Sequence, residues 1–222
     1  MAQMHHSMAE QMCRRFRITL PKQALAKNPD EAARAARRIG YPVALKVSSP
    51  DIVHKTEAGG LFLGIRAEQE LRERFKQVLV NSKKYKPRAR VAGVLVQEMV
   101  PGVETIVGAK QDATFGPVVM FGLGGIFVEV LKDVAFRLAP LEKSDAQGMV
   151  QEIKGYPVLA GARGKRPVNF KALEEALVKV SRMAWAHSPE GGRKKPLIKE
   201  LDINPLFVGP KRAVAADVRI II

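Results

Sequence analysis

The 222-residue sequence predicts an α+β protein with two lobes. Apolar strand patterns fall into two groups, divided near residue 98, and each group is accompanied by amphipathic helices. Most neighbouring strands are joined by short turns rich in glycine and proline, which favours hairpins over a parallel sheet. Hydrophobic residues make up 46% of the chain and charged residues 27%, a balance that argues against wholesale disorder.

Three helices and three strands are predicted in the first hundred residues. Asn28 or Asp30 can cap a helix that stops at Gly40, while Leu71, Phe75 and Val78 share one face of a later helix. The predicted helices lie over 9–17, 28–38 and 71–79. Apolar runs predict strands over 42–47, 61–65 and 91–100, with a polar loop over 48–60 and a basic loop over 83–90.

The rest of the chain continues mostly as strands until residue 138. Turn residues separate short apolar runs, which predict strands over 103–109, 118–121, 126–131 and 135–138. Two helices follow, one from Ser144 or Asp145 to Ile153 and one from Phe170 to Ala184. The last predicted elements are two paired strands, over 198–204 and 213–222.

The chain is strongly basic, with 37 lysine and arginine residues against 22 acidic ones and a net charge of +15. Such a charge raises the question of a nucleic-acid ligand. The basic residues are, however, divided into several small clusters, and aromatic residues, which would stack on bases, are only 6% of the chain. We therefore expect the charge to be dispersed over the surface, and nucleic acid not to be the main ligand.

The single cysteine, Cys13, excludes an internal disulfide and a cysteine-based zinc site. No apolar run approaches the roughly 18 to 20 residues of a membrane-spanning helix. Residues Met1 to Glu10 do not resemble a secretory signal. The expected location is therefore a reducing cytoplasm, with no membrane as a partner.

Lys46 projects from the predicted strand 42–47, and the loop after this strand ends in Gly59 and Gly60. An ammonium group beside free backbone N–H groups suits phosphate oxygens. A lysine on a strand is more often simply solvated, so the pattern alone leaves phosphate binding as the less common interpretation.

Polar and apolar residues alternate over Glu200 to Asn204, which on a strand places Asp202 and Asn204 on one face with Glu200. Asp217 lies between apolar neighbours on the next strand, where an unpaired carboxylate is costly. Oxygen ligands gathered in this way suit Mg²⁺. A solvated outer face with one salt-bridged aspartate explains the pattern equally well.

His54 lies in the polar loop between two predicted strands. Because imidazole is substantially unprotonated near neutral pH, its nitrogen can act as a base or accept a phosphoryl group. The residue pattern alone nevertheless favours an ordinary surface histidine.

Three long stretches resemble the beta subunits of the ADP-forming acyl-CoA synthetases (acetate–CoA ligase, ADP-forming). They are GYPVALKVSSPDIVHKTEAGG (40–60), the stretch 93–140 that contains FGLGGIFVEVLKD, and IKELDINPLFV (198–208). The resemblance covers about residues 16–220 and implies an ATP-grasp fold, with the nucleotide between two lobes. One lobe, residues 21–98, would carry the lysine and the histidine loop, and the other, residues 1–20 with 99–222, would carry the metal site.

The resemblance implies a set of nucleotide-binding residues. Lys46 matches the lysine that contacts the nucleotide phosphates, and Gly59 and Gly60 are assigned to the same site. Glu98 to Val100 match the segment whose backbone edges meet adenine, and Glu104 matches the acid placed near the ribose.

The resemblance also implies the metal and the reaction. Asn204 and Asp217 match the Mg²⁺ ligands of the related succinyl-CoA synthetase beta chain, in which a glutamate stands where this chain has Asp202. His54 matches the second phosphohistidine of the family, which collects phosphate from a histidine on the alpha subunit and delivers it to ADP. The expected reaction is acyl-CoA + ADP + Pi = acid + CoA + ATP.

A CoA-binding alpha subunit is the expected partner, most simply in an α2β2 assembly, because the chain has no evident CoA site. The His54 loop is expected to move, with Ser48–Ser49 and Gly59–Gly60 as hinges. Met1 to Glu10 and the insertion at Gly191 to Lys195 have no counterpart in the family. Two alternatives are a succinyl-CoA synthetase-like beta chain and a non-catalytic nucleotide-binding module.

Overall fold

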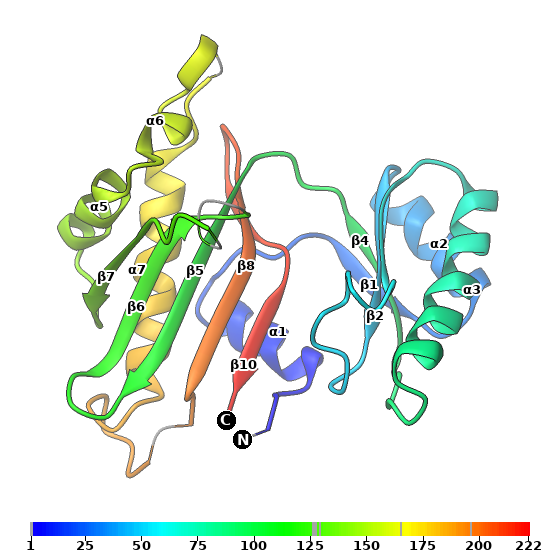
Figure 1. Cartoon of the computed structure of the whole chain (residues 1–222), viewed down its shortest axis with the longest axis horizontal. Coiled ribbons are helices and arrows are strands. Elements are labelled where there is room, and N and C mark those ends of the chain that lie inside the picture. Colours follow the sequence, from blue (N-terminus) through cyan, green and yellow to red (C-terminus); the bar gives the residue numbers. More distant parts are fainter. Residues whose placement is uncertain (1, 126–127, 129, 165, 196) are drawn as a thin grey trace. The chain divides into compact units, whose positions relative to one another are not determined.

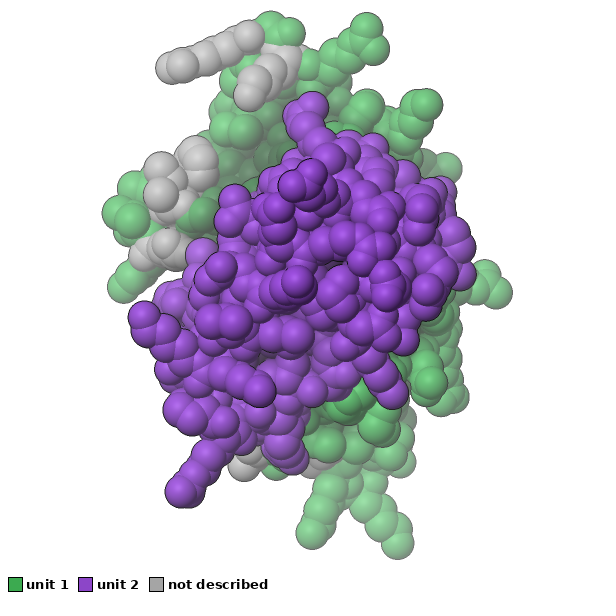
Figure 2. Space-filling view, turned by 90° about the vertical axis from the view of Figure 1, so that its right-hand side faces the viewer, with its two compact units in different colours: residues 1–20, 100–222 green, residues 21–99 purple. Residues whose placement is uncertain are grey.

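Two separate hydrophobic cores divide the chain into two units, residues 1–20 with 100–222 and residues 21–99 (Figure 2). This computed structural model describes residues 2–125, 128, 130–164, 166–195 and 197–222. Each unit combines one antiparallel sheet with helices, which confirms the predicted α+β class. Within the described ranges, no helix has both the length and the apolar character that crossing a membrane requires.

The unit of residues 21–99 contains a four-stranded sheet in the order β1-β4-β2-β3 (Figure 1). Its strands are β1 (Gln23–Ala26), β2 (Val43–Ser48), β3 (Leu61–Ile65) and β4 (Gly93–Glu98). Helices α2 (Pro29–Ile39) and α3 (Glu68–Tyr85) pack on one face of this sheet. Val43, Leu45 and Val47 of β2 belong to the core of this unit, because alternate residues of a strand share a face.

Helix α2 begins and ends where the sequence predicts. The Asn28 side chain accepts a hydrogen bond from the Glu31 backbone N–H at 2.9 Å, which satisfies one donor of the first turn. At the other end, Gly40 has a φ of 96° and its N–H donates to the Ala36 carbonyl at 2.8 Å. This backbone conformation favours glycine, so the residue sets the end of the helix.

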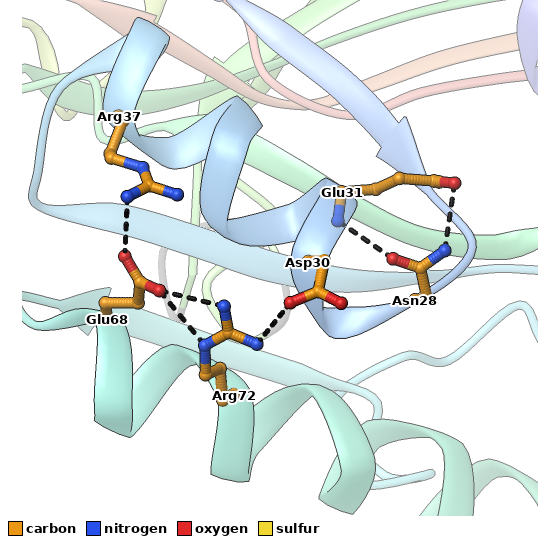
Figure 3. A network of polar contacts seen from close by, with 6 residues as sticks. All are labelled: Asn28, Asp30, Glu31, Arg37, Glu68 and Arg72. Atoms are coloured by element: carbon orange, nitrogen blue, oxygen red, sulfur yellow. Dashed lines mark hydrogen bonds and ion pairs between the residues drawn. The ribbon is translucent and has the colours of Figure 1, made fainter.

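Ion pairs join the facing sides of α2 and α3 (Figure 3). Arg72 of α3 donates to Asp30 of α2 at 2.7 Å and to Glu68, one helical turn earlier on α3, at 2.9 Å. Arg37 of α2 lies 3.4 Å from the other carboxylate oxygen of Glu68. The hydrogen bond from Arg72 lowers the pKa of Asp30, so this pair is charged across the neutral range. Because the groups are exposed, the network adds only modestly to the apolar contacts beneath it.

The unit of residues 1–20 with 100–222 contains a six-stranded sheet, in the order β10-β8-β5-β6-β7 with β9 also paired to β8 (Figure 1). Its strands are β5 (Val103–Asp112), β6 (Gly116–Leu123), β7 (Val134–Leu138), β8 (Glu200–Val208), β9 (Ala213–Ala215) and β10 (Val218–Ile221). Its helices are α1 (His6–Arg15), α5 (Lys143–Glu152), α6 (Tyr156–Leu159) and α7 (Phe170–Ala186), with a 3-10 turn at Ala162–Gly164.

Only one face of this sheet packs into the helix-lined core. Helix α7 contacts β5, β6, β8 and β9, while α5 contacts β6 and β7 and α1 contacts β10. Val107, Phe121 and Ile203 point into this core and are fully buried. Glu104 and Lys110 of β5 are exposed on the opposite face of the sheet, which also carries Gly108 and the exposed Phe136 of β7.

Several segments differ from the sequence prediction: helix α6 was not predicted, and the single strand predicted over 213–222 is divided into β9 and β10. Strand β1 was not predicted, because its sequence QALA has weak strand propensity and it is stabilised by pairing with β4. Helix α3 extends to Tyr85, so the predicted basic loop begins later than residue 83. Strand β8 continues through Pro205 to Val208. Of the predicted strand 126–131, residues 126, 127 and 129 lie outside the described residues, and Val130 and Leu131 form an exposed turn.

Replacing Arg72 with methionine should lower the melting temperature by a few degrees, because it removes the ion pairs with Asp30 of α2 and Glu68 of α3 while roughly keeping the length of the side chain. The loss should shrink in 1 M NaCl, where exposed pairs are screened. Lys76→Met on the exposed side of the same helix is the matched control, and it should leave the melting temperature nearly unchanged. Equal effects of the two variants would mean that the network does not stabilise this helix pair.

Candidate functional site

Lys46 lies in the centre of the four-stranded sheet, on the strand face opposite to the core residues Val43, Leu45 and Val47. The strand pairs it with Leu61 of β3 and Leu95 of β4. Only 8% of the lysine is exposed, so its ammonium is carried on a rigid strand and not on a flexible surface segment. A cation fixed in this way suits a polyanionic ligand better than a solvated lysine does.

Gly59 and Gly60 end the loop directly beside the strand of Lys46, since the Val47 N–H donates to the Gly60 carbonyl at 2.8 Å. Gly59 has a φ of 57°, and its carbonyl accepts a hydrogen bond from the Asn81 side chain of α3 at 2.8 Å. A Cβ at Gly60 would lie 2.6 Å from a methyl group of Val47. Backbone conformation therefore favours glycine at residue 59 and local packing favours it at residue 60, and the assignment of both to the nucleotide site stays a prediction.

His54 lies on the loop between β2 and β3, with 68% of its side chain exposed. Its carbonyl accepts a hydrogen bond from the Ala58 N–H at 3.1 Å, and the Lys55 carbonyl accepts one from Gly60 at 2.8 Å. The Glu57 carboxylate lies 3.9 Å from Nδ1 of the imidazole. The histidine is thus presented on a folded turn, with an acid beside one ring nitrogen and the ring accessible to a reactant.

Asn204 and Asp217 lie opposite each other where β8 pairs with the segment before β10. The Asn204 N–H donates to the Asp217 carbonyl at 3.1 Å, and the next pairs along the ladder are Ile203 with Val218 and Asp202 with Arg219. Residues directly opposite on paired strands place their side chains on the same face. The structure therefore brings these two predicted metal ligands together within one unit.

The polar face that the sequence predicts along β8 is present. Leu201 and Ile203 are at most 2% exposed, while Asn204, near the middle of β8, is exposed. The β5–β8 ladder shifts its register between Thr105 and Val107, which face Leu206 and Ile203. Two residues of β8 therefore stand opposite one residue of β5, and this extra residue lies next to the candidate metal ligands.

Two oxygen ligands on adjacent strands fit a magnesium ion that is held jointly with a nucleotide. No group of three or more histidine, cysteine or acidic side chains that could hold a metal exists among the described residues. Mg²⁺ is commonly bound by one or two protein carboxylates, substrate phosphates and water, so a complete protein cage is not needed. The donor set of Asn204 and Asp217 therefore matches this mode of binding.

The remaining predicted nucleotide residues lie where the chain passes from one unit to the other, at residues 98–100, and on β5. The Glu98 carboxylate accepts a hydrogen bond from the Lys22 N–H at 3.0 Å, which ties the end of β4 to the segment before β1. At Val100 the chain returns to the larger unit, which consists of residues 1–20 and 100–222. Glu104 is exposed on β5, on the sheet face that also carries Gly108, the partner of Asp202.

A hollow of about 500 Å³ lies on this same face of the larger sheet. Its lining includes Gly108, Met120, Phe136, Asp202 and Arg219. The sequence prediction missed Arg219, although it lies two residues after Asp217 and therefore on the same face of the strand. The combination of an apolar floor with charged groups at its edge is typical of a small-molecule site.

The model of the ATP-grasp domain family matches residues 2–222. The beta subunit of acetate–CoA ligase (ADP-forming) I from Pyrococcus furiosus is 47% identical over 215 residues, covering 96% of this chain and 89% of that subunit. The structure of Ca. Korarchaeum cryptofilum dinucleotide-forming acetyl-coenzyme A synthetase 1 with coenzyme A, Ca-AMPCP and HgCl+ is similar with a TM-score of 0.91 and 40% identity, covering 100% of this chain and 93% of that chain.

A second structure of that synthetase contains coenzyme A and Mg-AMPPCP, with its phosphohistidine segment pointing towards the nucleotide-binding site. Its TM-score to this chain is 0.82 at 35% identity, again covering 100% of this chain and 93% of that chain.

Gly60→Ala should destabilise the protein by about 1–3 kcal/mol, because the added methyl group overlaps the Val47 side chain in a well-packed region. Gly148→Ala is a suitable control: Gly148 lies in helix α5, and the nearest atom to an added Cβ is 3.7 Å away. The free energy of unfolding, measured by denaturant titration, should fall only for Gly60→Ala. If both variants were equally stable, the close contact would not be what requires glycine at residue 60.

Proposed function

The chain belongs to the ATP-grasp family of the ADP-forming acetate–CoA ligase beta subunits, and we propose that it is the nucleotide-binding catalytic subunit of an ADP-forming acyl-CoA synthetase. The ATP-grasp fold expected from the sequence is confirmed by the family match and by the similar synthetase structures. The observation that carries the proposal is the position of His54, whose exposed imidazole lies on the loop that leaves the strand of Lys46. This chain performs the nucleotide half of the reaction acyl-CoA + ADP + Pi = acid + CoA + ATP.

His54 carries the phosphoryl group in the step that forms ATP. A terminal phosphate oxygen of ADP attacks the phosphorus bound to the imidazole, so that a P–O bond forms while the P–N bond breaks. The ring nitrogen takes back its electron pair, and ATP leaves. In the reverse direction the same nitrogen attacks the γ-phosphorus of ATP and ADP is the leaving group.

The other candidate residues bind and orient the nucleotide. The ammonium of Lys46 contacts the phosphate oxygens, and its rigid strand keeps this charge in place during the transfer. The backbone at Glu98 and Val100 binds the edge of adenine, and Glu104 contacts the ribose. Gly59 and Gly60 keep the backbone of the loop close to the strand of Lys46.

Asn204 and Asp217 are the residues that would hold Mg²⁺ together with the nucleotide phosphates. When bound, the ion neutralises negative charge on the phosphate oxygens. Their backbones are joined by a direct hydrogen bond, so the positions from which the two side chains project are set before the nucleotide arrives. Such preorganisation lowers the cost of assembling the site.

A separate alpha subunit that binds CoA completes the enzyme, in line with the subunit names of the relatives. We propose an α2β2 assembly, as the resemblance implies.

Burial raises the pKa of the Cys13 thiol to about 12, so it stays protonated and unreactive near neutral pH. We place the enzyme in a reducing cytoplasm because its sequence has a single cysteine and hence no internal disulfide.

Replacing His54 with alanine should abolish the phosphoryl label on this chain. The wild-type complex with its alpha subunit, incubated with γ-labelled ATP and Mg²⁺, should acquire an acid-labile, base-stable phosphate that mass spectrometry places at residue 54. Formation of ATP from acyl-CoA should fall by several orders of magnitude in the variant. His187→Ala is unsuitable as a control because that side chain is buried, so His5→Ala, at an exposed position, serves instead. A label that persists in His54→Ala would overturn the relay assignment.

Alanine at Asn204 or Asp217 should reduce turnover by about 10²- to 10³-fold, the usual cost of removing a group that stabilises transferring charge. A second readout does not depend on activity. Mg²⁺ added with a non-hydrolysable ATP analogue should raise the melting temperature of the wild type and much less that of either variant. Glu200→Ala, on the same strand face, is the control and should keep the Mg²⁺-dependent shift. Wild-type turnover and an unchanged shift in the double variant would remove these residues from the metal site.

A further inference from the structure

The loop that carries His54 is attached to the rest of its unit at both ends. After the histidine, Ala58 is 3% exposed, and the carbonyl of Gly59 accepts a hydrogen bond from Asn81 of α3 at 2.8 Å. Before the histidine, Ile52 is 1% exposed and packs in the core of the smaller unit. The exposed part of the loop is therefore the short segment between residues 52 and 58.

Asp51, at the start of this segment, is bound by Arg90 from the far end of the connection between α3 and β4. Arg90 donates from Nε to one carboxylate oxygen of Asp51 at 2.9 Å and from Nη2 to the other at 2.8 Å. The backbone N–H of Arg90 adds a third bond to the same carboxylate at 2.8 Å. Two parallel bonds from a planar guanidinium define the orientation of a carboxylate, which a single contact does not.

The contacts around this pair reach the backbone of the loop as well. The Lys86 ammonium donates to the Asp51 carbonyl at 3.1 Å, and the Asp51 N–H donates to the Ser49 hydroxyl at 3.1 Å. Hydrogen bonds from Arg90 hold the pKa of Asp51 well below its usual range, so the pair is ionised at any physiological pH. The side chain of Arg90 itself is 77% exposed and contributes little to the core.

We propose that the Asp51–Arg90 pair positions His54: it fixes the backbone three residues before the histidine, and so holds the imidazole where phosphoryl donor and nucleotide must both reach it. This inference rests on the proposed relay function of His54. The sequence predicts a loop that swings about a hinge at Ser48–Ser49, but hydrogen bonds hold the chain on both sides of that hinge. The Ser48 carbonyl accepts a hydrogen bond from the Ala92 N–H at 2.8 Å, and Arg90 binds the Asp51 carboxylate. Misplacing a reacting group by about 1 Å costs up to roughly 100-fold in rate, so a fixed loop end matters for the transfer.

The test is the rate at which γ-labelled ATP phosphorylates this chain in the complex with its alpha subunit. Arg90→Met removes both side-chain bonds to Asp51 and keeps the backbone bond. Labelling should slow by about 10- to 100-fold, while the KM for ATP stays within about twofold because Arg90 is not assigned to nucleotide binding. Arg90→Lys, which keeps the charge without the planar pair of donors, should be intermediate. Arg88→Met is the matched control, with the same charge change on an exposed residue of the same connection, and should label at the wild-type rate.

The outcomes separate the inference from the function on which it rests. Absence of label on the wild-type chain would contradict the relay itself. Normal labelling of both wild type and Arg90→Met would leave the relay intact and refute the positioning role. An equal slowing in Arg88→Met, or a slowing that disappears once rates are normalised to folded protein, would also refute it. If Arg90→Met does not fold, Asp51→Asn and Arg90→Lys provide the same comparison, with slower labelling at unchanged KM as the supporting result.

Discussion

Each sheet buries one face in a helix-lined core, and the position of every candidate residue on a strand depends on this constraint. On β2, Val43, Leu45 and Val47 fill the core of the smaller unit, which leaves Lys46 on the opposite face. Burying a valine or leucine side chain is worth about 1.5–3 kcal/mol, whereas an unpaired ammonium in an apolar core is strongly unfavourable. A slip of one residue would exchange the two faces, so the apolar residues determine where the lysine points.

The same constraint positions the candidate metal ligands, with one local exception. Leu201 and Ile203 are buried, and after Pro205 the buried positions are Leu206 and Val208, so the alternation changes phase between them. The register shift against β5 supplies the extra residue that makes this change possible. Asn204 lies at this irregularity, which agrees with the frequent occurrence of such shifts beside functional sites.

Local contacts account for two features that the residue pattern presents as functional. Gly59 and Gly60 suggest a phosphate-binding backbone, but the positive φ of Gly59 and the close contact of Gly60 with Val47 already favour glycine. Some of the basic residues likewise form ion pairs within the smaller unit, where Arg72 binds the carboxylate of Asp30 and Arg90 binds that of Asp51. These pairs shape the helix layer and the histidine loop, so a basic composition does not by itself indicate a polyanionic partner.

The α+β class, most helices and strands, and the faces of β2 and β8 can be predicted from the residue pattern, because periodicity and helix caps are local properties of the chain. The sequence also determined the family, through long motifs that include Lys46 and His54. The register that pairs Asn204 with Asp217, and the bond between Asp51 and Arg90, 39 positions apart, became visible only in the folded chain. The tertiary structure also decided that QALA forms an edge strand. These features depend on which distant segments become neighbours, and that is settled by the packing of the whole unit, which no local pattern encodes.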